Sequence, residues 1–179
     1  TSFTIESILR RRPTPVNRAA LDSRPPSGVA SAAMSDDLVF LDATAQAELV
    51  RRRAVSPREL VDAAIARIER TNPALNAVVT TRFAQARAEA EAPALPDGPF
   101  RGVPFLLKDL ICHSAGDPYH AGMRLLRDLG WREAEDTVLA ARFRAAGFVF
   151  LGKTNTPELG PVPTTEPEAY GPTRNPWDP

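Results

Sequence analysis

Several residue types are scarce in this sequence of 179 residues, and each scarcity excludes a class of protein. Its one cysteine cannot form an internal disulfide. This cysteine and the two histidines of the sequence are together too few for a typical structural zinc site. No apolar run approaches the roughly 20 residues that cross a bilayer. The 22 basic residues balance 22 acidic ones, so charge favours neither nucleic acid nor a membrane surface as a partner. We expect a soluble, cytoplasmic protein without a metal or cofactor.

Lysine is also scarce. Of the 22 basic residues, Lys108 and Lys153 are the two lysines and the other 20 are arginines. Arginine stays protonated at any working pH, whereas a buried lysine can lose its proton and act as a base. The composition therefore makes these two lysines candidates for chemistry.

The chain divides near Met34. Residues 1–34 are rich in arginine, proline and serine and have no sustained periodicity, so we expect a disordered or mis-translated leader. A transit peptide is the alternative, because such peptides are rich in arginine and serine and poor in acidic residues. The folded part is expected to span residues 35–179. Its last stretch, from Pro157, is proline-rich and should be extended or turning backbone.

Capping signals predict the helices. Ser56, Pro57 and Glu59 form a capping box with proline at the first helical position, and this helix should end at Asn72 and Pro73. Further helices are expected after Asp42 or Thr44, over residues 82–91, and from an Asp136 cap to Gly147.

Short apolar runs predict the strands. Residues 75–80 form one plausible strand, and residues 103–107 and 148–151 are fully apolar runs separated by a capped helix. This pattern is typical of a buried, mostly parallel sheet, in which ligands bind beyond the carboxyl ends of the strands. We expect both lysines at those ends. The local sequence supports a second interpretation of Lys108 equally well: its aliphatic side chain covers the edge of the core and its charged end reaches solvent, without a chemical role.

Two apparent motifs do not carry function. Residues 147–154, GFVFLGKT, satisfy the phosphate-loop pattern, but their four middle residues are strand formers rather than a loop that converges N–H groups on phosphate. Cys112 and His113 are adjacent, so on extended backbone they should point to opposite sides and not act together. His120 is expected to be an ordinary loop residue. The carboxylates between Asp109 and Asp136 show no metal-binding spacing and are expected in helix caps and solvated faces.

Four segments in order resemble the amidase signature family. They are LDATAQAELVRRR at 41–53, RGVPFLLKDL at 101–110, LGKTNTPELG at 151–160 and TTEPEAYGPTRNPWDP at 164–179. The first resembles the 6-aminohexanoate cyclic dimer hydrolase branch of that family. The resemblance implies an α/β fold with a mixed sheet between layers of helices, of which residues 35–179 would be the N-terminal part. The loop at 112–123 matches less well, which leaves the substrate open.

The resemblance also implies a chemistry. Lys108 matches the family's catalytic lysine, which draws a proton from a bridging serine; that serine activates a nucleophilic serine, and amide bonds are hydrolysed through an acyl-enzyme. A lysine that serves as a base near neutral pH needs a pKa roughly three units below its usual value of about 10.4, and burial can supply such a shift. Lys153, Asn155 and Glu158 are expected to brace the neighbouring loop.

The sequence departs from the family pattern at its end. In the family a glycine-rich stretch with the bridging serine follows the segment that matches Pro176 and Trp177, and the nucleophile lies further on. Neither serine is present here, so we expect this piece to be inactive alone. The complete form would take a small-molecule amide and could form homo-oligomers. Alternatives are the glutamine-hydrolysing subunit of a tRNA-dependent amidotransferase, or a short non-catalytic binding protein.

Overall fold

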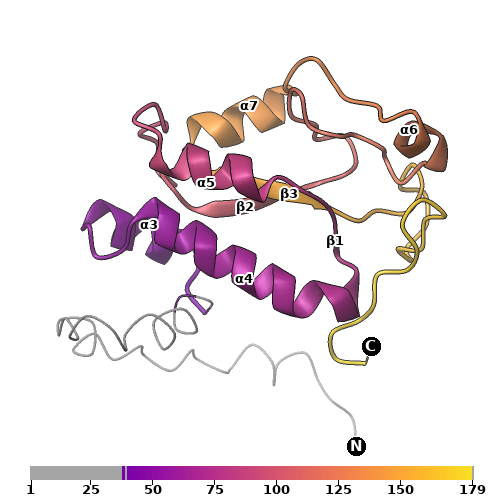
Figure 1. Ribbon diagram of the computed structural model, residues 1–179, viewed down its shortest axis with the longest axis horizontal. Coiled ribbons are helices and arrows are strands. Elements are labelled where there is room, and N and C mark those ends of the chain that lie inside the picture. The colour runs from indigo at the N-terminus through magenta and orange to yellow at the C-terminus, as the bar shows by residue number, and fades with distance from the viewer. Residues whose placement is uncertain (1–37, 39, 179) are drawn as a thin grey trace, which may run out of the picture. The chain divides into compact units, whose positions relative to one another are not determined.

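The computed structural model describes residue 38 and residues 40–178. The leader expected over residues 1–34 lies outside these described residues. Along the chain the elements are α3 (Ala43–Arg51), α4 (Pro57–Leu75), β1 (Val78–Thr81), α5 (Phe83–Glu91), β2 (Pro104–Lys108), α6 (Arg124–Asp128), α7 (Val138–Ala145) and β3 (Val149–Thr154). Figure 1 shows the strands lying between helices.

The three strands form one mixed sheet in the order β1-β3-β2. β2 and β3 run parallel, as the two apolar runs predicted, and α7 lies between them in the sequence. β1 pairs with β3 in the antiparallel direction, so the prediction of a mostly parallel sheet is wrong for this strand. The mixed sheet between helices agrees with the fold that the family resemblance implied.

Helices cover both faces of the sheet (Figure 1). On one face, α4 and α5 pack on β3 through Val61, Ile65 and Ala86, which are fully buried with Leu151. On the other face, Ala140 of α7 packs with Leu107, Cys112 and Phe150. These two apolar clusters define the faces of the sheet, which we call the α4 face and the α7 face.

A β-bulge changes which face β3 presents. Phe105 pairs with Phe150, but the next residue of β2, Leu106, pairs with Gly152, so β3 carries one extra residue. An extra residue shifts the alternation of side chains by one position. As a result Lys153 pairs with Leu107 and shares the α7 face, whereas regular alternation would place it on the α4 face with Leu151.

The capping box predicted for α4 is present. The Glu59 amide donates to Ser56 Oγ at 3.2 Å, and the Ser56 amide donates to Glu59 Oε2 at 2.8 Å. The prediction that the helix ends at Asn72 and Pro73 is wrong. The helix continues through Pro73 to Leu75, and its C-cap, Asn76, has the left-handed conformation. A proline so close to the end removes one hydrogen bond without disrupting many others.

Replacing Ser56 by alanine should lower the free energy of unfolding by about 1 kcal/mol, because the first turn of α4 loses an acceptor for its free N–H groups. Ser56→Thr keeps the hydroxyl and should retain most of the stability. Urea unfolding of the 179-residue chain followed by circular dichroism measures both. Equal stabilities of the alanine variant and the parent chain would contradict this role for the cap.

Other helix boundaries refine the predictions. Asp42, one of two expected caps, accepts from the Ala45 amide at 2.8 Å at the start of α3. The cap of α7 is Thr137 rather than Asp136, because the Thr137 hydroxyl accepts from the Ala140 amide. Asp136 instead pairs with Arg144 at 2.9 Å. The short helix α6 was not predicted. None of the helices in the described part has the length and apolar content needed to cross a membrane.

Candidate active site

Lys108 is the last residue of β2, at the carboxyl end where ligand sites were expected. Its side chain is exposed, so the burial that was expected to suit this lysine for the role of a base is not supplied by the residues that the structure describes. Alternation from Leu107 on the α7 face places the side chain on the α4 face. The ladder with β3 continues one residue further, because the Asp109 amide donates to the Thr154 carbonyl at 3.0 Å. The backbone on both sides of Lys108 is therefore held by β3.

Lys153 has a different environment. It lies inside β3 and is only 2 % exposed, so the prediction that it stands beyond the strand end is wrong. The bulge turns it to the α7 face, where Nζ donates to the Cys112 carbonyl at 3.3 Å and lies 5.4 Å from the centre of the Tyr119 ring. Burial lowers the pKa of Lys153, and the negative charge of Asp109 opposes that shift.

Asp109 is a buried carboxylate whose negative charge acts on Lys153. It is 1 % exposed, and Oδ1 accepts from the His120 amide at 3.0 Å. Among the described residues, its Oδ2 atom has no hydrogen-bond partner. Burial raises the pKa of Asp109, while the His120 amide and the charge of Lys153 act in the opposite direction. The expectation of a solvated or capping carboxylate is wrong for this residue.

His120 and Tyr170 extend this buried group toward the C-terminal segment. His120 is 6 % exposed rather than at a loop surface, and its Nδ1 atom is hydrogen-bonded to the Tyr170 hydroxyl. Burial lowers the pKa of His120, and Asp109 opposes the shift. The Arg127 guanidinium lies 6.0 Å from the centre of the Tyr170 ring. The buried residues Asp109, His120 and Lys153, with the half-buried Tyr170, are called the buried polar cluster below.

Burial raises the pKa of Tyr170 to about 12. An unfolded tyrosine ionises at about 10, so between these two values the folded protein holds a proton that the unfolded chain has released. The free energy of unfolding should therefore fall as the pH rises from about 10 to about 12. Tyrosinate absorbance during a pH titration of the folded chain should show an ionisation step near pH 12, which we assign to Tyr170. The Tyr170→Phe variant should lack this step. A parent chain in which that step is absent would contradict the burial.

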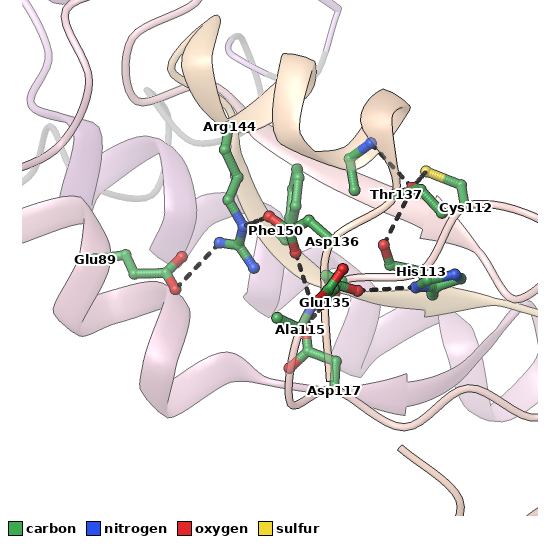
Figure 2. Close-up of polar contacts among 12 residues, drawn as sticks. Glu89, Cys112, His113, Ala115, Asp117, Glu135, Asp136, Thr137, Arg144 and Phe150 are labelled. Carbon is green, nitrogen blue, oxygen red and sulfur yellow. Dashed lines mark hydrogen bonds and ion pairs between the residues drawn. The ribbon is translucent and has the colours of Figure 1, made fainter. Parts of the chain in front are cut away.

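Cys112 and His113 do not form a catalytic pair. Figure 2 shows the thiol beside Thr137, with Oγ1 and Sγ 3.9 Å apart, while the His113 ring points to the Glu135 carbonyl at 3.0 Å. This divergence agrees with the prediction from alternation. Within the described residues, no three His, Cys, Asp or Glu side chains gather closely enough to hold a metal ion.

The residues of the phosphate-loop pattern lie in a strand rather than in a loop. Its middle residues lie in or next to β3 and pack in the two apolar clusters, so their N–H groups do not line a loop. A groove of about 370 Å³ does exist between α4 and β2, with Leu60, Ile68 and Phe105 in its lining. The walls of this groove are mostly apolar and include neither lysine.

Hydrogen bonds hold the proline-rich C-terminal segment near the end of β3 and the end of α4. Asn155, directly after β3, donates from Nδ2 to the Gly171 carbonyl at 3.1 Å and to Thr173 Oγ1 at 2.9 Å. Thr173 donates in turn to the Asn76 carbonyl at 2.7 Å, at the end of α4. Asn155 thus supports this segment, as expected, whereas Glu158 is exposed.

Comparisons with known proteins place this arrangement in a family. The family model named Amidase matches residues 59–179, more than half of the chain. A 6-aminohexanoate-cyclic-dimer hydrolase of Paenarthrobacter ureafaciens is 51 % identical over 145 residues, which are 81 % of this chain and 29 % of that protein. An acylamidase of Rhodococcus erythropolis is 39 % identical over 147 residues, 79 % of this chain and 30 % of that protein. A glutamyl-tRNA(Gln) amidotransferase component of Salinispora arenicola is 40 % identical over 148 residues, with the same two coverages.

A solved structure agrees with the sequence comparisons. It is a 6-aminohexanoate cyclic dimer hydrolase complexed with substrate, with a TM-score of 0.74, 52 % identity, and coverage of 79 % of this chain and 29 % of that one. The chain thus spans less than a third of the length of these relatives. With a matching family model, a relative that is 51 % identical and a solved structure of the same fold, this chain belongs to the amidase family.

Proposed function

We propose that the complete form of this protein hydrolyses carboxamides and that Lys108 is its general base. The observation that carries the proposal is the position of Lys108 within the family motif. It ends a parallel strand whose backbone is fixed by β3, and its side chain is exposed. An amine in this place can receive a proton from a hydroxyl group brought to it.

The proposed reaction transfers protons in a fixed order. The amine of Lys108 takes a proton from a bridging serine, which takes one from the nucleophilic serine as its oxygen attacks the amide carbon. The C–N bond then breaks, and the leaving amine receives the proton by the reverse path. Water hydrolyses the resulting ester by the same route. The two serines follow from the family resemblance and are not assigned to residues of this chain.

Lys153 is a poor candidate for the same role. Its ammonium group is enclosed on the α7 face and already donates to the Cys112 carbonyl. The bulge at Gly152 separates it from Lys108 by placing the two side chains on opposite faces of the sheet. A substrate that reaches Lys108 therefore does not reach Lys153.

The substrate class proposed is a linear or cyclic oligoamide. It is supported by the half-identical relative named for the cyclic dimer of 6-aminohexanoate and by the solved complex of such a hydrolase with its substrate. The lower identity of the amidotransferase component makes glutamine hydrolysis the weaker candidate.

A chimera tests the function. Residues 35–179 replace the matching part of the Paenarthrobacter hydrolase, whose remainder supplies the rest of the domain. We expect release of amine from 6-aminohexanoate cyclic dimer, and no comparable release from glutamine. A folded chimera that hydrolyses neither would overturn the proposal, and preference for glutamine would favour the amidotransferase alternative.

A further inference from the structure

We propose that Asp109 and Lys153 are positioning residues, whose buried opposite charges hold the end of β2 so that Lys108 projects from the other face of the sheet. The inference rests on the proposed function and assigns these two residues no proton transfer. It is drawn from the buried polar cluster, in which Asp109 was expected from the sequence to be a solvated or capping carboxylate and His120 a loop residue.

Burial makes the two charges depend on each other. Asp109 and Lys153 are 1 % and 2 % exposed, and taking a lone charge out of water is costly unless an opposite charge or hydrogen bonds compensate. Lys153 donates a hydrogen bond to the Cys112 carbonyl, and Asp109 Oδ2 has no partner among the described residues. Their mutual attraction therefore acts through space in a poorly screened interior.

Other charged groups contribute less direct compensation. Asp117, Glu133 and Cys112 also act on Lys153, and His120 acts on Asp109. Asp117 is held by Arg82 at 3.2 Å, and Glu133 accepts from the Trp131 indole at 3.1 Å. Of these carboxylates, Asp109 is therefore the buried one whose charge stabilises the charged form of Lys153.

The pair acts on Lys108 through the backbone. Asp109 follows Lys108 directly, and its side chain is fixed by the His120 amide while its own amide donates to Thr154. Successive strand residues point to opposite faces. Asp109 lies one residue beyond β2, and its attraction to Lys153 holds the junction from which Lys108 projects to the α4 face. Loss of either charge should let this junction rotate.

The experiment uses the chimera of residues 35–179 with Lys153→Met, Asp109→Asn and the double variant. Each single variant should lower kcat by about 100-fold with little change in KM, because misplacing a reacting group by about 1 Å costs that much. The double variant leaves neither charge unpaired. Its kcat should therefore fall by less than about 100-fold relative to the parent, and its urea midpoint should lie above that of either single variant. Lys153→Arg keeps the charge and should recover part of kcat.

Phe150→Leu is the control for stability alone. It removes buried volume from the same face of β3 and should lower the urea midpoint without changing kcat per folded molecule, as measured after correction by circular dichroism. Single variants with parental kcat, or losses that simply multiply in the double variant, would overturn the proposal. If the parent chimera is inactive, the proposed function fails, and the urea midpoints alone still decide whether the two charges are coupled.

Discussion

Replacing Lys108 by alanine in the chimera should reduce amide hydrolysis by at least about 1,000-fold. A positioned general base contributes about 100- to 10,000-fold to a rate, and here its loss also interrupts the activation of the nucleophile. Lys108→Arg should be as inactive, because a guanidinium keeps its proton at working pH. Steady-state release of amine from the cyclic dimer measures both variants.

The fold should survive this substitution. The Lys108 side chain is exposed in the described structure and takes no part in either apolar cluster, so circular dichroism and the urea midpoint should change little. Arg124→Ala, at another exposed basic residue of this chain, is the matched control and should keep parental turnover. Retained hydrolysis in the Lys108→Ala variant would show that the base had been assigned to the wrong residue.

Replacing Gly152 by alanine should destabilise the protein by about 3 kcal/mol or more, since backbone strain and overpacking each cost about 1–3 kcal/mol. Gly152 has a φ of 153°, and an added Cβ would lie 2.1 Å from the Thr80 carbonyl oxygen of the neighbouring strand. Neither β1 nor β3 can move without breaking the ladder between them. Urea unfolding of the chimera measures the loss.

Gly116 provides the control for that experiment. It also has a positive φ, 75°, but a Cβ there meets nothing within 4 Å. Gly116→Ala should therefore cost only the backbone strain of about 1–2 kcal/mol. If the two alanine variants lose the same stability, close packing of β1 against Gly152 is not the reason that glycine is needed.

Local signals were sufficient to predict most of the fold. The capping box at Ser56, the apolar runs of β2 and β3, and Gly147 after α7 each depend on neighbours in the sequence, so their patterns are visible without tertiary information. Pro73 was misjudged because proline is tolerated near a helix end when the next residues can still close the last turn. The antiparallel direction of β1 depends on its partner, and no local pattern encodes it.

The candidate site was less predictable. Lys108 was predicted as the base because it follows an apolar run and lies in a motif that resembles the family's. Asp109 and His120 were missed because a carboxylate and a loop histidine have no local mark of burial, and the chain that covers them comes from distant segments. The bulge at Gly152 reversed the side chain of Lys153, and the glycine was its one visible signal.

The separation of the two lysines by the sheet has a practical consequence. An amine-directed acylating reagent, applied under native conditions, meets one solvated lysine side chain and one that the interior protects. Modification would thus concentrate at the proposed base, apart from the chain's own terminus. Because arginine supplies the other basic side chains of these 179 residues, Lys108 is nearly a single site for acylation within them, at the place where the reaction is proposed to occur.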